Sequence, residues 1–365
     1  MSEAGAWRWK ALGVAAALVA ATGNCSSSGD AGPAPPSGGG PDGGGDADEP
    51  IVPGTGAPCT PQKHETIGIK VALDANWAAT PGTMGCAESS GCKGTIYLWL
   101  LSQFDISGQA ATGTTTTCGN QTPTVELTQL GSESEGVPSG GAKVTIQFPA
   151  SVWDAVATNP MKPPVASAAV LGGWNVGSSF KVDPTVVTFG LKPSSALAAA
   201  SATWPASQSE IAAADISDDD NDGHPGITAT PSSSDGNSLP ATGLTTAPPY
   251  APQADELYVA LRTELSFYGL ATSCTEVSGT ANAELFNNHV IGCHLQGGGD
   301  CTPTEWDFVD QMSTVYVGSG VTVPAGVPPA SLAPAGITGT FAAKLLATDP
   351  DGGGIDCAAV RAALP

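Results

Sequence analysis

Three aspartates near the middle of the chain have a spacing that suits a hard metal cation. Asp218, Asp220 and Asp222 alternate with other residues, and Gly223 follows the last of them. In a tight turn, such alternate carboxylates converge on one side, and the glycine permits the bend. Calcium takes about six to eight oxygen ligands at roughly 2.3–2.6 Å, and a loop of this kind supplies several of them. The run therefore predicts a structural calcium site.

Residues 218–223 resemble the calcium loops of EF-hand, dockerin and thrombospondin-type repeats. The chain departs from the EF-hand at Ala229, where that family carries a bidentate glutamate, and residues 227–230 predict a strand where the family has a helix. We therefore expect one calcium loop outside any EF-hand pair, completed by the His224 carbonyl, by Asp215 and by water, with an affinity on the order of 10⁻⁴–10⁻³ M. The alternative is a solvated acidic turn without an ion.

Local signatures of catalysis are absent from the sequence. It contains no G-x-S-x-G, H-E-x-x-H or G-x-x-x-x-G-K-[ST] motif, and no G-x-G-x-x-G that joins a strand to a helix. A pair of carboxylates about 5–10 Å apart, as glycosidases use, leaves no compulsory motif. Asp105, Glu264 and Glu284 are candidates for such a pair by position, and each is interpreted first as an exposed carboxylate. The sequence leaves catalysis open and leans against it.

The first 24 residues have the pattern of a signal peptide. Arg8 and Lys10 precede an apolar run of 11 residues, Ala11–Ala21, and small residues follow it. This run is too short to cross about 30 Å of hydrocarbon, which takes roughly 20 helical residues. We therefore expect the segment to direct export.

The end of this segment, Thr22-Gly23-Asn24-Cys25, resembles the lipobox of bacterial lipoproteins, in which the processed chain begins with a lipid-modified cysteine. The resemblance implies a membrane anchor at Cys25, and Ser26 implies delivery to the outer membrane or cell surface. The alternative is an ordinary secretory signal cut after Gly23, which would give a secreted or periplasmic protein.

A predicted tether covers residues 25–58. Residues 26–58 contain 10 glycines, 7 prolines and five acidic residues but no basic residue. Such a segment buries too little apolar surface to offset the entropy of ordering it. A flexible chain of this length reaches about 30 Å, which would hold a folded body clear of a membrane.

Nine cysteines are present, and assigning Cys25 to lipid leaves an even number, which could form disulfides in an oxidising compartment. The remaining cysteines are Cys59, Cys86, Cys92, Cys118, Cys274, Cys293, Cys301 and Cys357. Proximity along the chain favours a Cys86–Cys92 bridge and a Cys274–Cys293 bridge. Elimination then pairs Cys301 with Cys357 and Cys59 with Cys118.

Composition excludes several classes of protein. The 365 residues include 34 acidic and 12 basic side chains, for a formal net charge of -22. Such a charge repels a phosphate backbone, so we expect no nucleic-acid partner. With 47 Gly, 31 Pro and 6% aromatic residues, the chain is a poor candidate for a helical bundle, a coiled coil or a multi-span membrane protein.

The body from Cys59 onward has mainly the two-residue periodicity of β-strands. Alternating apolar residues predict strands over 67–77, 144–148 and 182–189, separated by turn-forming residues. Few helices are expected: one over 303–312, and a short one over 357–364 capped by Asp356. The predicted fold class is all-β, an antiparallel sandwich or barrel.

A weak internal repeat suggests a duplicated β unit. Residues 97–108 align without gaps to residues 258–269, with three identities. We therefore expect a first β half at 59–200 and a second at 258–365, joined by a linker at 201–257 that carries the acidic loop. Within and next to this linker, the Ala-rich residues 194–214 are expected to form a helical crossover or an irregular connection.

Together these features predict an exported, lipid-anchored surface protein with a binding or structural role, stabilised by disulfides and calcium. One alternative is a carbohydrate-binding or carbohydrate-processing sandwich, because sugars stack on exposed indole rings. The tryptophans considered for this are Trp77, Trp99, Trp153, Trp174, Trp204 and Trp306. Another alternative is a barrel that carries an apolar ligand in a cavity lined by Leu98, Leu100, Val259 and Leu261. The membrane partner follows from the lipid, and any protein or glycan partner is left open.

Overall fold

The computed structural model describes most of the predicted β body. The described residues are 49–78, 84–85, 93–122, 125–129, 142–205, 208–233, 239–240, 253–303, 315–317 and 337–365. The predicted signal peptide, the lipidation site at Cys25, the Cys86–Cys92 bridge and most of the helix expected over 303–312 lie outside them. Among the described residues, no helix is long and apolar enough to cross a membrane.

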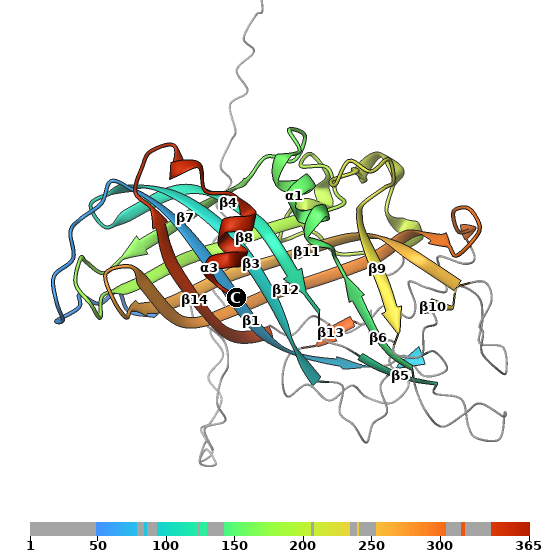
Figure 1. Ribbon diagram of the computed structural model, residues 1–365, viewed down its shortest axis with the longest axis horizontal. Coiled ribbons are helices and arrows are strands. Elements are labelled where there is room, and N and C mark those ends of the chain that lie inside the picture. Colours follow the sequence, from blue (N-terminus) through green and yellow to red (C-terminus); the bar gives the residue numbers. More distant parts are fainter. Residues whose placement is uncertain are drawn as a thin grey trace, which may run out of the picture. The chain divides into compact units, whose positions relative to one another are not determined.

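Antiparallel strands form a sheet that closes on itself (Figure 1). Each strand pairs with the next one in the ring, and the last pairs with the first, because β12 pairs with both β11 and β14. The ring order is β1 (His64–Ala78), β3 (Lys93–Ser107), β4 (Ala110–Gln121), β7 (Val165–Leu171), β8 (Ser179–Phe189), β11 (Gln253–Ala271), β12 (Glu276–Leu295) and β14 (Ile337–Ala347). The all-β antiparallel prediction is therefore confirmed, and the closed ring is a barrel in which neighbours in sequence are neighbours in space.

Shorter strands extend the sheet from the long strand β11. They run outward in the order β9 (Ile227–Ser233), β6 (Ala142–Gln147), β5 (Val125–Gln129) and β2 (Met84–Gly85). Strand β10 (Leu239–Pro240) also pairs with β11, and β13 (Val315–Val317) pairs with β1. Strands from both predicted halves thus pair within one sheet, through β8 with β11 and β1 with β14.

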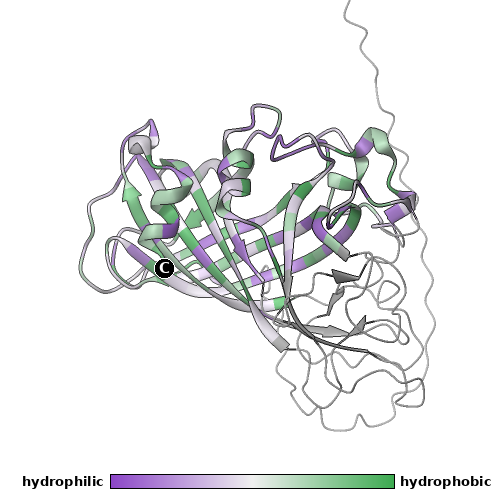
Figure 2. Cartoon of the chain, turned by 45° about the vertical axis from the view of Figure 1, so that its right-hand side comes forward, coloured by the Kyte–Doolittle hydropathy of each residue, from purple (hydrophilic) through white to green (hydrophobic). Residues whose placement is uncertain are grey.

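The barrel core follows from alternation along the strands (Figure 2). On β1, Ile67, Ile69, Val71 and Leu73 are all at most 6% exposed. They pack with apolar residues of the other ring strands, including Phe180, Phe267 and Phe341. Burying every second side chain of each strand inside the ring stabilises the closed form.

A second apolar cluster lies beside the first and involves α1 (Ala150–Thr158). Trp153 of this helix is 2% exposed and packs against Phe189 with ring centroids 5.1 Å apart. Val259 and Leu261 belong to this second cluster, whereas Leu98 and Leu100 belong to the barrel core. The four residues considered for an apolar ligand cavity are therefore divided between two packed clusters.

Helix α3 (Cys357–Ala363) confirms the short helix expected near the C-terminus. The Asp356 carboxylate accepts a hydrogen bond from the Ala359 amide at 2.9 Å, as an N-cap does. Within the described part of the chain, short 3₁₀ segments occur at Ala196–Ala198 (η2), Gln208–Glu210 (η3), Ala213–Asp215 (η4) and Gly352–Gly354 (η6). The Ala-rich segment 194–214 is thus an irregular connection and not a helical crossover.

Three disulfides are present among the described residues: Cys59–Cys274, Cys118–Cys357 and Cys293–Cys301. The expected pairings Cys274–Cys293, Cys301–Cys357 and Cys59–Cys118 are therefore wrong. Cys274 precedes β12 and Cys293 lies near its far end, so an extended strand of about 3.3 Å per residue keeps them roughly 60 Å apart. Sequence proximity failed because long strands carry nearby residues to opposite ends of the barrel.

The chain before β1 lies along one end of the barrel. The Gly56 amide donates to the Val176 carbonyl at 3.0 Å, and the Ser179 amide donates to the Val52 carbonyl at 3.0 Å. The Cys59–Cys274 bond then fixes this segment to the turn between β11 and β12. Residues 52–58, which the sequence placed in the tether, are therefore hydrogen-bonded to the folded body.

Candidate metal centre

The acidic run forms a closed loop between η4 and β9. The Asp219 amide donates to the Gly226 carbonyl at 2.9 Å, and the Gly226 amide donates to the Ser217 carbonyl at 2.7 Å. Asn221 and Gly223 have left-handed backbones, with φ of 58° and 95°. Gly223 thus has the conformational role that the motif predicts, because a residue without a Cβ takes this conformation at little cost.

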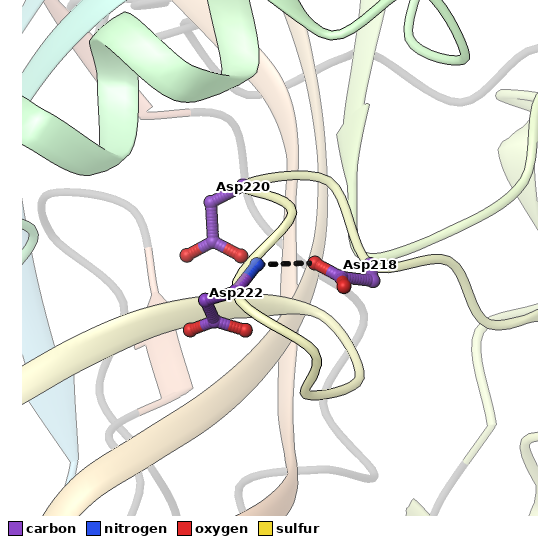
Figure 3. A group of neighbouring side chains, drawn as sticks. All are labelled: Asp218, Asp220 and Asp222. Carbon is purple, nitrogen blue, oxygen red and sulfur yellow. Dashed lines mark hydrogen bonds between the residues drawn. The ribbon is translucent and has the colours of Figure 1, made fainter.

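Three carboxylates of the loop face one another (Figure 3). Asp218, Asp220 and Asp222 each offer an oxygen, and these oxygens lie within 4.8 Å of one another. Asp218 accepts hydrogen bonds from the amides of Asp222 and Gly223, at 3.2 and 2.9 Å. Asp222 accepts from the His224 amide at 2.8 Å and from the Thr228 hydroxyl at 2.5 Å. The turn therefore fixes the carboxylates as a preformed group.

Asp220 is the buried member of this group, with 7% of its surface exposed. Its Oδ2 accepts a hydrogen bond from the Thr228 amide at 2.8 Å, whereas its buried Oδ1 has no hydrogen-bond partner among the described residues. Burial, and secondarily the charges of Asp222 and Asp218, raises the pKa of Asp220 to about 6. A buried acceptor without a partner costs about 1–3 kcal/mol, and more when it is charged. A cation at this oxygen would remove that cost.

Asp219 points away from this group and anchors the loop instead. It is 1% exposed, and its Oδ2 lies 2.8 Å from the Lys162 ammonium and accepts the Gly190 amide at 2.8 Å. Its Oδ1 accepts the Ser217 hydroxyl at 2.6 Å. Burial lowers the pKa of Lys162, and the Asp219 charge opposes that shift. The ion pair ties the loop to the segment between α1 and β7, and the Gly190 hydrogen bond ties it to the residue that follows β8.

Asn159, directly after α1, also holds the loop. Its side-chain amide donates to the carbonyls of Asp218 and Asp219, at 3.3 and 3.0 Å. The sequence did not predict Asn159, Lys162 or Thr228 as parts of this site. Alternation within the run could have separated Asp219 from its neighbours, but its partners Lys162 and Gly190 come from segments far away in sequence.

Two further ligands were predicted, the His224 carbonyl and Asp215. The His224 ring stacks on Tyr258 of β11, with centroids 4.5 Å apart, so its side chain clamps the loop to the barrel. Burial and nearby Asp300 raise the pKa of Tyr258, whose hydroxyl lies 3.3 Å from that carboxylate. Asp215 ends η4 and is not part of the group of converging carboxylates. Of the predicted set, Asp218, Asp220 and Asp222 are brought together, and His224 follows them.

The carboxylates considered for glycoside chemistry do not form one group. Asp105 ends β3 beside His64, with Nδ1 and Oδ1 2.6 Å apart. Glu264 lies on β11, and burial, with the charge of nearby Glu284, raises the pKa of Glu264. Asp105 and Glu264 therefore lie on strands that are not neighbours in the ring.

The described indole rings do not form an exposed platform for sugar stacking. Trp153 is 2% exposed, and Trp99, Trp174 and Trp204 are partly buried. Trp204 is covered by stacking on His289, with centroids 5.7 Å apart. The side chain of Trp77 and all of Trp306 lie outside the described residues.

Protein-family models, curated proteins and solved structures were compared with the chain, and none of them matches it.

Proposed function

We propose that this chain is an exported, lipid-anchored cell-surface protein with a binding or structural role, whose disulfide-bonded barrel is stabilised by one calcium ion. The single observation that carries the calcium part is the buried Oδ1 of Asp220, which has no partner and belongs to a group of three converging carboxylates. Disulfides are present in the fold, and they support a location in an oxidising compartment.

The chemistry of the donors favours calcium over a transition metal. The converging ligand atoms are all carboxylate oxygens, with no imidazole nitrogen or thiolate among them. Hard cations select such oxygens, whereas zinc and copper favour nitrogen and sulfur. Asp218, Asp220 and Asp222 would hold the ion, and Thr228 and Asn159 would support them. The loop already contacts the end of β8 and the start of β9, so an ion there would join both strands.

Thermal unfolding in excess calcium and in chelator tests this site. At a free concentration about 10–100 times Kd, a native-state ligand stabilises by roughly 1.4–2.7 kcal/mol, which for a domain of this size raises Tm by several degrees. We expect this rise in the wild-type protein and its loss in Asp220→Asn.

The matched control is Asp183→Asn, which makes the same charge change at an exposed position of β8. This control should keep the full calcium response. Equal Tm values in calcium and chelator for the wild type would reduce the loop to an acidic turn.

The lipid anchor is tested at Cys25. In a bacterial host, we expect the full-length protein to incorporate a labelled fatty acid and to remain with the membrane fraction. Cys25→Ser should lose both properties, because only the thiol can carry the lipid. A mature wild-type chain that begins at Asn24 without lipid, measured by mass spectrometry, would instead establish the secretory alternative.

A further inference from the structure

A cavity of about 80 Å³ opens at the end of the barrel where β1 begins. The Cys59–Cys274 disulfide forms part of its rim. Its walls are largely apolar and include Ile67, Trp174 and Phe180. The cavity is therefore bounded in part by a disulfide, and no residue of the acidic loop lines it.

Glu65 lines this cavity and carries a carboxyl group among mainly apolar neighbours. It precedes Ile67 by two residues on β1, so strand alternation directs it to the same, inner side of the barrel. Among the described residues, its carboxyl group has no hydrogen bond and no ion pair. Burial raises the pKa of Glu65 to about 7. This half-buried carboxylate lines a largely apolar cavity without a basic partner, so it is available to a cationic ligand.

The other charged groups around Glu65 are mostly acidic. Glu276 lines the same cavity, and neither Lys nor Arg is among its lining residues. A neighbouring hollow of about 210 Å³ shares Glu65 and adds Asp105, Asp349 and His64. The His64 ring is already bonded to Asp105 at 2.6 Å. The local field therefore attracts cations and repels anions.

We propose that this cavity binds small alkylamines as their ammonium ions, with the charged nitrogen at the Glu65 carboxylate and the alkyl chain against Ile67, Trp174 and Phe180. Pairing with an ammonium ion would satisfy the carboxylate through a charge-assisted hydrogen bond. A cavity that holds benzene measures about 150 Å³, so this smaller space suits a short alkyl chain and excludes a long acyl chain.

The amine site is independent of the calcium loop. Ser179 lines the cavity at the start of β8, whereas Gly190, directly after β8, binds Asp219 of the loop. At about 3.3 Å per strand residue, the two sites lie roughly 35 Å apart. Failure of one proposal therefore leaves the other unaffected.

Isothermal titration calorimetry of the full chain at pH 8 with n-butylamine, n-butanol and butyrate tests the proposal. We expect saturable binding of n-butylamine, and binding at least tenfold weaker for n-butanol and butyrate, because only the amine carries a cation. Equal affinity for butanol, or no saturable binding of the amine, would overturn the proposal. This comparison needs only the wild-type protein.

Variants then assign the binding to Glu65. Glu65→Gln keeps the size of the side chain but removes its charge, so it should weaken n-butylamine binding at least tenfold. Glu284→Gln makes the same change at an exposed position of β12 and should keep the affinity within twofold. Near-UV circular dichroism verifies that both variants fold. Unchanged amine affinity in folded Glu65→Gln would place the ligand elsewhere and refute the assignment.

Discussion

Neighbouring aspartates in the acidic loop have different environments because the backbone alternates. Asp219 is paired with Lys162 and buried, while Asp218 and Asp220 turn toward Asp222. The buried pair fixes the loop, and the unpaired oxygen of Asp220 leaves a place for a cation. One short run of like residues therefore supplies both the anchor and the candidate ligands.

At the same scale, Glu65 should make stability depend on pH. Its carboxyl has an ordinary pKa of 4.5 and a folded-state pKa of about 7. Between these values the folded state holds more protons than the unfolded state, so the free energy of unfolding falls as pH rises, by about 1–3 kcal/mol in total. Glu65→Gln should flatten this decline and be more stable than the wild type at pH 8.

Urea unfolding at pH 5, 6, 7 and 8 without amine measures this effect. Asp183→Asn, at an exposed position of β8, is the control and should follow the wild-type curve. A Glu65→Gln curve parallel to the wild type across this range would show that the carboxyl ionises normally in the folded protein.

Among the elements, the irregular segment before the acidic loop is held by one buried side chain. Arg262 of β11 is 2% exposed, and its guanidinium donates to the carbonyls of Leu197, Ala199 and Ala202. It also donates to the Asn287 side chain at 2.9 Å. A fully hydrogen-bonded guanidinium thus replaces the backbone ladder that this segment lacks.

Helix α3 is an element held to the barrel by several bonds. Cys357 is bonded to Cys118 of β4, and the Trp99 indole donates to the Leu364 carbonyl at 2.7 Å. The Cys118–Cys357 bridge spans 239 residues, whereas Cys293–Cys301 spans 8. In the chain-entropy model the longer loop contributes more, so replacing Cys118 and Cys357 by Ala should cost about 2–4 kcal/mol, and more than replacing Cys293 and Cys301.

Denaturant unfolding of the two double variants gives this comparison. Hydrogen exchange should also show faster exchange of the α3 amides in the variant without Cys118 and Cys357. Equal losses of stability in the two variants would contradict an entropic role for the longer bridge.

For the whole molecule, the sequence predicted what depends on local pattern. Alternation identified β1, β6 and β8, because each strand buries every second side chain. Likewise, alternating aspartates before Gly223 predicted carboxylates that the loop does bring together. Asp356 predicted the start of α3, because its carboxylate accepts a hydrogen bond from the amide only three residues later in the chain.

Features that depend on long-range pairing could not be predicted in the same way. The repeat of 97–108 in 258–269 suggested a duplicated β unit but left open whether it forms one barrel or two sandwiches, and β3 and β11 belong to one closed ring. No sequence pattern singled out Glu65, because its cavity is completed by Trp174 and by the turn around Cys274, far away in sequence. The disulfide pairings failed for the same reason.

The Cys59–Cys274 bond also determines how the body would bear mechanical load. A pull on the chain before Cys59 passes through the disulfide into the turn that joins β11 and β12. Strand β1 begins at His64, beyond the bond, so the force bypasses the seam that β1 forms with β3 and β14. Tension is instead applied to a hairpin of 19- and 20-residue strands. The barrel would thus resist being peeled open from its N-terminal end for as long as that disulfide stays oxidised.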